Sequence, residues 1–137
     1  MGLYLCVFDN DTELEGVEVG SYADFNAVRD HIIRALEWGV PGSRFPTLIL
    51  HSDSDGEWTV ADCEVLRTEL EVIAAEMKHS AAVPFASEWQ KTAAKSLGMV
   101  PTNAFESFID VDGELLLQRL LDLVDVALKR KLPVLFQ

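Results

Sequence analysis

The sequence contains few cysteines, no long apolar run and no recognisable export signal. Cys6 and Cys63 are the only two cysteines among 137 residues, too few for a disulfide scaffold, and free thiols are typical of a reducing compartment. No apolar run approaches the length of a membrane span. The opening MGLYLCVF has no basic region and no small-residue cleavage site, so it indicates a first strand and not a signal peptide. We therefore expect a cytoplasmic protein.

Motifs for catalysis are also missing. There is no G-x-S-x-G nucleophile elbow, and the glycines are scattered without forming a phosphate-binding loop. Neither cysteine has a basic neighbour in the sequence that would activate it. His31 and His79 have no metal-ligand partner four residues away. These absences favour a protein that is not an enzyme and uses no cofactor.

Basic residues are scarce in the first half of the chain. Residues 1–76 hold 16 acidic residues against four arginines, a net charge of −12, whereas residues 77–137 hold seven residues of each sign. The net charge of the whole chain therefore belongs to its first half. This charge disfavours nucleic acids and anionic membranes as partners and favours a basic protein, because opposite fields speed encounter. Acidity that only maintains solubility is the alternative.

The strongest secondary-structure signal is a helix near the carboxyl end, in residues 113–131. Apolar residues recur there in two adjacent stripes at helical spacing, so we expect the helix to be buried on several sides. Asp112 is placed to cap its first turn, and Pro133 prevents its continuation. The stripes are Leu116, Leu120, Leu123 and Ala127, and Leu117, Leu121, Val124 and Leu128.

Shorter patterns predict three further helices and four strands. Capping boxes at Ser21, Thr59 and Ser87 mark the starts of the helices. Short apolar runs predict a central strand at residues 47–51 and an edge strand at residues 134–136. The other two predicted strands span residues 3–8 and 16–20. This order predicts a single α+β domain, in which a small mixed β-sheet packs against about four helices, including the buried C-terminal helix.

The segment HSDSDGEWTVAD, which starts at His51, has the sharpest site pattern. With Gly56 as the turn glycine of a calcium loop, Asp53, Asp55 and Asp62 fall at ligand positions. However, His51 is a poor ligand for a hard cation, and Asp62 is too short for the usual bidentate glutamate. We prefer an acidic turn followed by a capped helix. A metal-dependent enzyme that uses this loop is the alternative.

Trp58 stands beside this acidic segment. An exposed aromatic residue ringed by acids is typical of a protein-binding hot spot, whereas core packing is the alternative for this and the other two tryptophans. A second acidic group surrounds Asp11 and Glu13, and it would lie close to this segment if the first and third predicted strands are neighbours. The two groups together with His51 could then bind a transition-metal ion. The expected partner-binding residues are Asp53, Asp55, Glu57, Trp58, Asp11 and Glu13.

Four stretches together resemble one protein family: MGLYLCVF at the start, EGVEVGSYADF, the SDGEW turn, and SFIDVDGELL through KRKLPVLFQ at the end. Across residues 1–137 the chain resembles the bacterial immunity protein 70 family of polymorphic-toxin systems. The resemblance implies a cytoplasmic protein that is encoded beside a toxin, binds the cognate toxin domain and is not an enzyme. It carries over no functional residues. The acidity fits a basic toxin, with a nuclease as one candidate, and a regulatory or structural interaction module is the other alternative.

Overall fold

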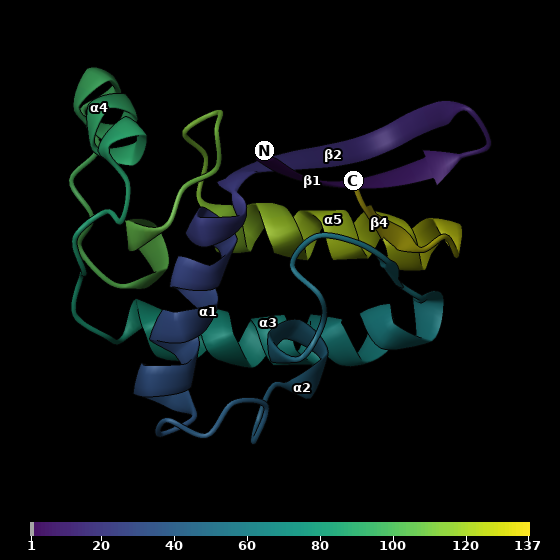
Figure 1. Ribbon diagram of the computed structural model, residues 1–137, viewed down its shortest axis with the longest axis horizontal. Helices are drawn as coiled ribbons and strands as arrows, with labels where there is room; N and C mark the ends of the chain where they lie inside the picture. Colours follow the sequence, from purple (N-terminus) through teal and green to yellow (C-terminus); the bar gives the residue numbers. More distant parts are fainter. Residues whose placement is uncertain (1) are drawn as a thin grey trace.

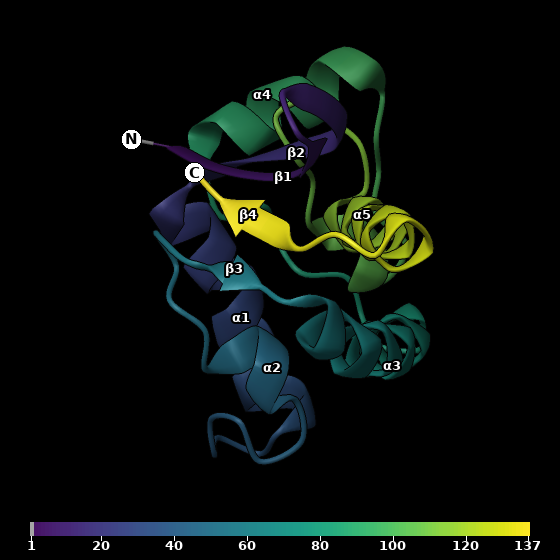
Figure 2. The same ribbon diagram turned by 90° about the vertical axis from the view of Figure 1, so that its right-hand side faces the viewer.

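The protein folds around a four-stranded antiparallel sheet. The computed structural model describes residues 2–137 (Figure 1), and its strands lie in the order β2-β1-β4-β3, which Figure 2 shows. β1 and β2 form a long hairpin, β4 pairs with β1, and β3 pairs with the other side of β4. The strands are β1 (Gly2–Asp9), β2 (Thr12–Ser21), β3 (Glu57–Trp58) and β4 (Val134–Phe136).

The described part of the chain also contains five α-helices, of which α1, α2, α3 and α5 pack against the sheet or against each other. α5 lies beneath the hairpin with α3 alongside it, while α1 and α2 form a second group below β3 (Figure 2). The prediction of a single α+β domain is confirmed, but the sheet is antiparallel throughout and not mixed. The helices are α1 (Tyr22–Leu36), α2 (Pro46–Ile49), α3 (Val60–Lys78), α4 (Glu88–Leu97) and α5 (Leu116–Arg130), with a 3-10 turn at Phe105–Ser107.

α5 is the buried helix that the apolar stripes predict. The prediction that Asp112 caps it is wrong, because the N-cap residue is Leu115 and no side chain caps the first turn. Instead, Asp110 accepts hydrogen bonds from the backbone N–H groups of Asp112 and Glu114 (3.0 and 2.9 Å), which shapes the turn before the helix. The buried residues of α5 are Leu116, Leu117, Leu120, Leu121, Leu123, Val124 and Ala127.

The segment predicted as the central strand forms the short helix α2 instead. Pro46 occupies the first helical position, where its fixed φ suits a helix and its missing N–H is not needed. β4 takes the interior place in the sheet, so the prediction that residues 134–136 form an edge strand is also wrong. The edge on that side is β3, whose two residues leave little backbone open to unwanted pairing.

Asp24 joins the start of α1 to the start of α4. Its carboxylate is 4% exposed and accepts hydrogen bonds from the Ser21 backbone N–H (2.8 Å) and the Trp89 Nε1–H (3.0 Å). The hydroxyl groups of Ser21 and Ser87 also donate to it. Burial alone would raise the pKa of Asp24, but these hydrogen bonds together outweigh burial and lower the pKa below its usual value.

We expect Asp24→Asn to lower the free energy of unfolding at pH 7 by about 2 kcal/mol, because an amide cannot accept all of these hydrogen bonds. The carboxylate stabilises the fold above its unfolded pKa of about 3.9, and this stabilisation is lost as the pH falls through the lower folded pKa. Urea unfolding at pH 7 and pH 3 measures both effects. The difference between wild type and variant should shrink at pH 3, and an equal difference at both pH values would contradict this role.

Candidate functional site

The acidic loop (residues 51–57) connects α2 to β3 and is closed by the ring of His51. Nδ1 of His51 lies 2.8 Å from the Ser52 carbonyl oxygen, and Nε2 lies 2.9 Å from the Glu57 carbonyl oxygen. The same ring stacks on Phe136 of β4, with ring centroids 4.2 Å apart. Both ring nitrogens are therefore engaged by the loop's own backbone, and neither is free to bind a metal ion.

The three acidic side chains of this loop are held in different ways. Asp55 and Glu57 are exposed. Asp53 is half-buried and accepts a hydrogen bond from Asn26 Nδ2 of α1 (2.7 Å). The loop thus presents two carboxylates to solvent, while the third anchors it to α1.

Arg29 holds the end of α2 where the acidic loop begins. Its guanidinium donates to three backbone carbonyl groups near that end and, through Nη2, to Asn26 Oδ1 (2.7 Å). Burial lowers the pKa of Arg29, and the nearby carboxylate of Asp53 opposes that effect. Asp53, Asn26 and Arg29 therefore form one chain of contacts that links the loop to α2. The carbonyl acceptors are those of Leu48 (3.2 Å), Ile49 (3.2 Å) and His51 (2.7 Å).

Glu69 of α3 holds the other end of α2. Its carboxylate is 6% exposed and accepts hydrogen bonds from the backbone N–H groups of Thr47 (3.2 Å) and Leu48 (3.0 Å). A carboxylate thus lies at the N-terminus of α2 and a guanidinium at its C-terminus, the arrangement that the helix dipole favours. Neither Arg29 nor Glu69 is singled out by the sequence, because their acceptors and donors lie about 20 residues away.

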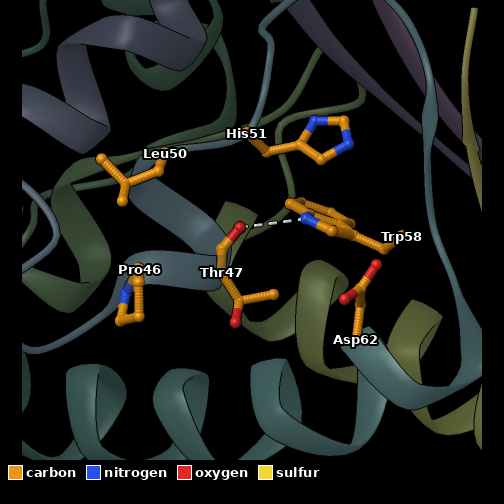
Figure 3. A pocket seen from close by; sticks show the side chains of 6 residues that line it. All are labelled: Pro46, Thr47, Leu50, His51, Trp58 and Asp62. Carbon is orange, nitrogen blue, oxygen red and sulfur yellow. Dashed lines mark hydrogen bonds between the residues drawn. The ribbon is translucent and has the colours of Figure 1, made fainter.

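Trp58 is buried in the core, where its indole joins β3 to α2. The side chain is 1% exposed, and its Nε1–H donates to the Thr47 carbonyl oxygen at 3.1 Å (Figure 3). Its ring also packs edge-on against Phe136. Core packing is therefore confirmed for Trp58, and its assignment as an exposed hot-spot residue is wrong. For Trp38 the opposite holds, because its side chain is 86% exposed.

Asp11 and Glu13 lie away from the acidic loop. Glu57 pairs with Leu135, which in turn pairs with Cys6, so the residues before Glu57 extend towards the start of β1. The turn of the β1–β2 hairpin lies at the other end of β1 (Figure 1), and β2 and β3 form opposite edges of the sheet. The sheet therefore does not bring the two acidic groups together.

Comparison with known families identifies the chain. A family described as immunity protein 70 matches residues 3–136. The chain belongs to this immunity protein family. The match covers nearly the whole chain, so the resemblance is confirmed, and membership supports an immunity role. No curated protein and no solved structure matches. Across residues 2–137, none of the helices combines the length and the apolarity needed to cross a bilayer.

The described residues of this immunity protein offer no assembled metal site. Across residues 2–137, no three His, Cys, Asp or Glu side chains form a group that could hold a metal ion. Asp62, which falls at a ligand position of the calcium-loop pattern, instead accepts a hydrogen bond from the Thr59 backbone N–H (3.0 Å) in the capping box that opens α3. The interpretation of an acidic turn followed by a capped helix is confirmed. The metal-dependent alternative gains no support from the geometry.

Leu50 is a surface residue of this immunity protein that the sequence did not single out. Its side chain is 65% exposed at the end of α2. It lines an open hollow of about 290 Å³ between α2 and the acidic loop, whose other walls include Pro46, Trp58 and Asp62 (Figure 3). The available signal was Pro46, because a helix that begins there turns Leu48 and Ile49 inwards, where both are buried, and leaves Leu50 outside.

Proposed function

We propose that this immunity protein binds a cognate toxin domain in the cytoplasm and blocks it by direct contact, without catalysis. The family match is the observation that carries this proposal. The absence of an assembled metal-ligand cluster among residues 2–137 agrees with inhibition by contact. A fold that fixes an exposed acidic loop through partly buried hydrogen bonds supports binding too, because a preorganised surface loses little entropy when a partner docks.

The charge of the protein favours a basic toxin domain. Residues 1–76 carry the whole net charge of −12, and Asp55 and Glu57 are exposed on the acidic loop. We propose that Asp53, Asp55 and Glu57 belong to the toxin-facing surface. Asp11 and Glu13 lie at the far end of the sheet, so they add to the attracting field without sharing the same contact. A nuclease is one class of toxin with the required basic surface.

Co-expression with the toxin domain encoded by the neighbouring gene tests the proposal in cells. The toxin domain alone should stop growth, and the immunity protein should restore it. Toxin domains from unrelated systems provide the specificity control, and their toxicity should be unaffected. A cognate toxin that kills equally well in the presence of the immunity protein would contradict the proposal.

Replacing Asp55 and Glu57 by lysine should slow association with the toxin domain by about tenfold at low salt, because opposite fields accelerate encounter. The dependence of the association rate on salt should also flatten. The same variant carries Asp53→Asn, because a lysine at position 53 would place a second positive charge near Arg29. The matched control reverses two exposed acids elsewhere, Glu88 and Asp112. Stopped-flow measurement gives the association rates. If both sets of substitutions slow association equally, the acidic loop is not part of the toxin-facing surface.

A further inference from the structure

The exposed apolar side chains around α2 form a second feature next to the acidic loop. We propose that this α2 patch, defined by Pro46, Leu50, Val65 and Val72, receives an apolar anchor side chain of the toxin domain. The inference rests on the proposed function and assigns a further part of the same contact. The occupant is one apolar side chain flanked by basic residues on the toxin.

The α2 patch contains two hollows that meet at Pro46. The first, of about 290 Å³, lies between α2 and the acidic loop and is lined in part by Leu50. The second, of about 340 Å³, lies between α2 and α3 and is lined in part by Val65 and Val72. The exposed fractions are 65% for Leu50, 52% for Val65 and 36% for Val72. Adjacent exposed apolar side chains beside concave surface are typical of a contact that another protein covers.

The segment that carries this patch is held rigidly by buried charges. Glu37 is 1% exposed and accepts hydrogen bonds from the backbone N–H groups of Gly42, Arg44 and Phe45, at 3.0, 3.0 and 2.9 Å. Arg29 and Glu69 then fix the two ends of α2. Three buried charged groups therefore hold the segment from which Pro46 and Leu50 are exposed to solvent, and this arrangement favours binding by preorganisation.

The position of Leu50 is fixed as well. Gly42 has a φ of +78°, and a Cβ atom at that position would lie 2.8 Å from the Leu50 side chain. The Leu50 side chain thus rests against the Gly42 backbone, which needs both the absent side chain and the positive φ of a glycine. An exposed leucine with a fixed position loses little side-chain entropy when an anchor side chain of the partner packs against it.

The charges beside the patch select a basic partner. Asp62 lines the first hollow, and the acidic loop borders it. The cation that lines the second hollow, Arg44, is paired with Glu76 through two contacts, Nη1–Oε1 at 3.0 Å and Nη2–Oε2 at 2.5 Å. The charge available to a partner around the patch is therefore negative. An apolar side chain between lysines or arginines of the toxin domain complements it.

The acidic loop and the α2 patch should act on different rates. Exposed charges accelerate encounter, whereas a desolvated apolar anchor slows dissociation. Leu50→Ala is therefore expected to raise the Kd for the toxin domain about 30-fold, almost entirely through faster dissociation. Val65→Lys places a positive charge in the second hollow, where it would repel the basic residues of the toxin domain. It should raise the Kd by about tenfold or more.

Leu97→Ala is the matched control, because Leu97 is also a leucine near a helix end, 59% exposed, but lies on α4 and away from α2. Surface plasmon resonance with the purified toxin domain gives both rates, and urea unfolding checks that each variant is folded. A faster dissociation for Leu50→Ala with an unchanged Leu97→Ala supports the patch. If the wild type binds and Leu50→Ala dissociates no faster than Leu97→Ala, the patch is excluded and the proposed function stands. If the wild type does not bind, the proposed function fails and this inference fails with it.

Discussion

Replacing Arg29 by methionine is expected to lower the free energy of unfolding by about 3–5 kcal/mol, the cost of removing one partner from a buried charged network. Methionine keeps the apolar stem but donates no hydrogen bonds. The carbonyl groups at the end of α2 then lose a donor that lies 2.7 to 3.2 Å away in the wild type, and Asp53 loses its nearby cation. Unsatisfied buried acceptors and an unpaired carboxylate are both costly, so the effect is large.

Arg34→Met is the matched control for Arg29→Met. Arg34 lies on the same helix, is exposed, and within residues 2–137 its side chain donates one hydrogen bond, to the Asp30 carbonyl oxygen at 3.4 Å. Its replacement should change the free energy of unfolding by less than about 0.5 kcal/mol. Urea unfolding followed by tryptophan fluorescence compares the two variants. Equal effects would show that the contacts of Arg29 do not hold α2 and the acidic loop in the way described.

Trp58→Ala should have an effect of similar size, about 3–5 kcal/mol, through loss of apolar burial and the cavity that remains. The indole is 1% exposed and lies against Phe136 and His51, with ring centroids 4.7 and 5.5 Å apart. Its removal also leaves the Thr47 carbonyl oxygen without its donor. One substitution therefore loosens the sheet edge, α2 and the acidic loop together.

Trp38→Ala is the control for Trp58→Ala, since it makes the same chemical change at a side chain that is 86% exposed. Trp38 has a φ of +51°, a strain that alanine keeps, so the backbone cost does not change. The free energy of unfolding should shift by less than about 0.5 kcal/mol. Thermal unfolding by circular dichroism separates the two variants. A destabilisation by Trp38→Ala as large as that by Trp58→Ala would contradict the buried role of Trp58.

The helices that begin at capping boxes could be predicted because their signals are local. Ser21 with Asp24 and Thr59 with Asp62 form the predicted boxes at the starts of α1 and α3, and Ser87 with Gln90 forms one at α4. The apolar stripes of α5 were equally informative, since a helix that is apolar over most of its surface must be buried. These signals need only residues within two turns of each other.

The errors arose where a distant contact decides the structure. Residues 47–51 are apolar and short enough for a strand, but Glu69 and Arg29 stabilise them as a helix from about 20 residues away. The short apolar run at residues 134–136 predicts an edge strand, whereas the pairing of β4 with both β1 and β3 depends on tertiary folding. Periodicity contains no information about such partners.

The candidate site shows the same division. The sequence located the acidic loop, and the structure confirms that Asp55 and Glu57 are exposed. It did not locate Leu50, because a leucine in a predicted central strand is expected to be buried. Burial of Trp58 and exposure of Trp38 depend on which face each presents in the folded chain. A site formed by tertiary packing is therefore only partly visible in its sequence.

Neutralisation of a toxin domain by direct binding is the function that we propose for this immunity protein. The most direct test titrates the purified toxin domain with the purified immunity protein, while toxin activity and complex formation by size-exclusion chromatography with light scattering are followed together. Activity should fall in proportion to the immunity protein added and reach its minimum at a one-to-one ratio, where a stable complex appears. Full toxin activity in the presence of excess immunity protein, or protection of cells without any complex, would contradict the claim and would indicate a protein that removes the product of the toxin.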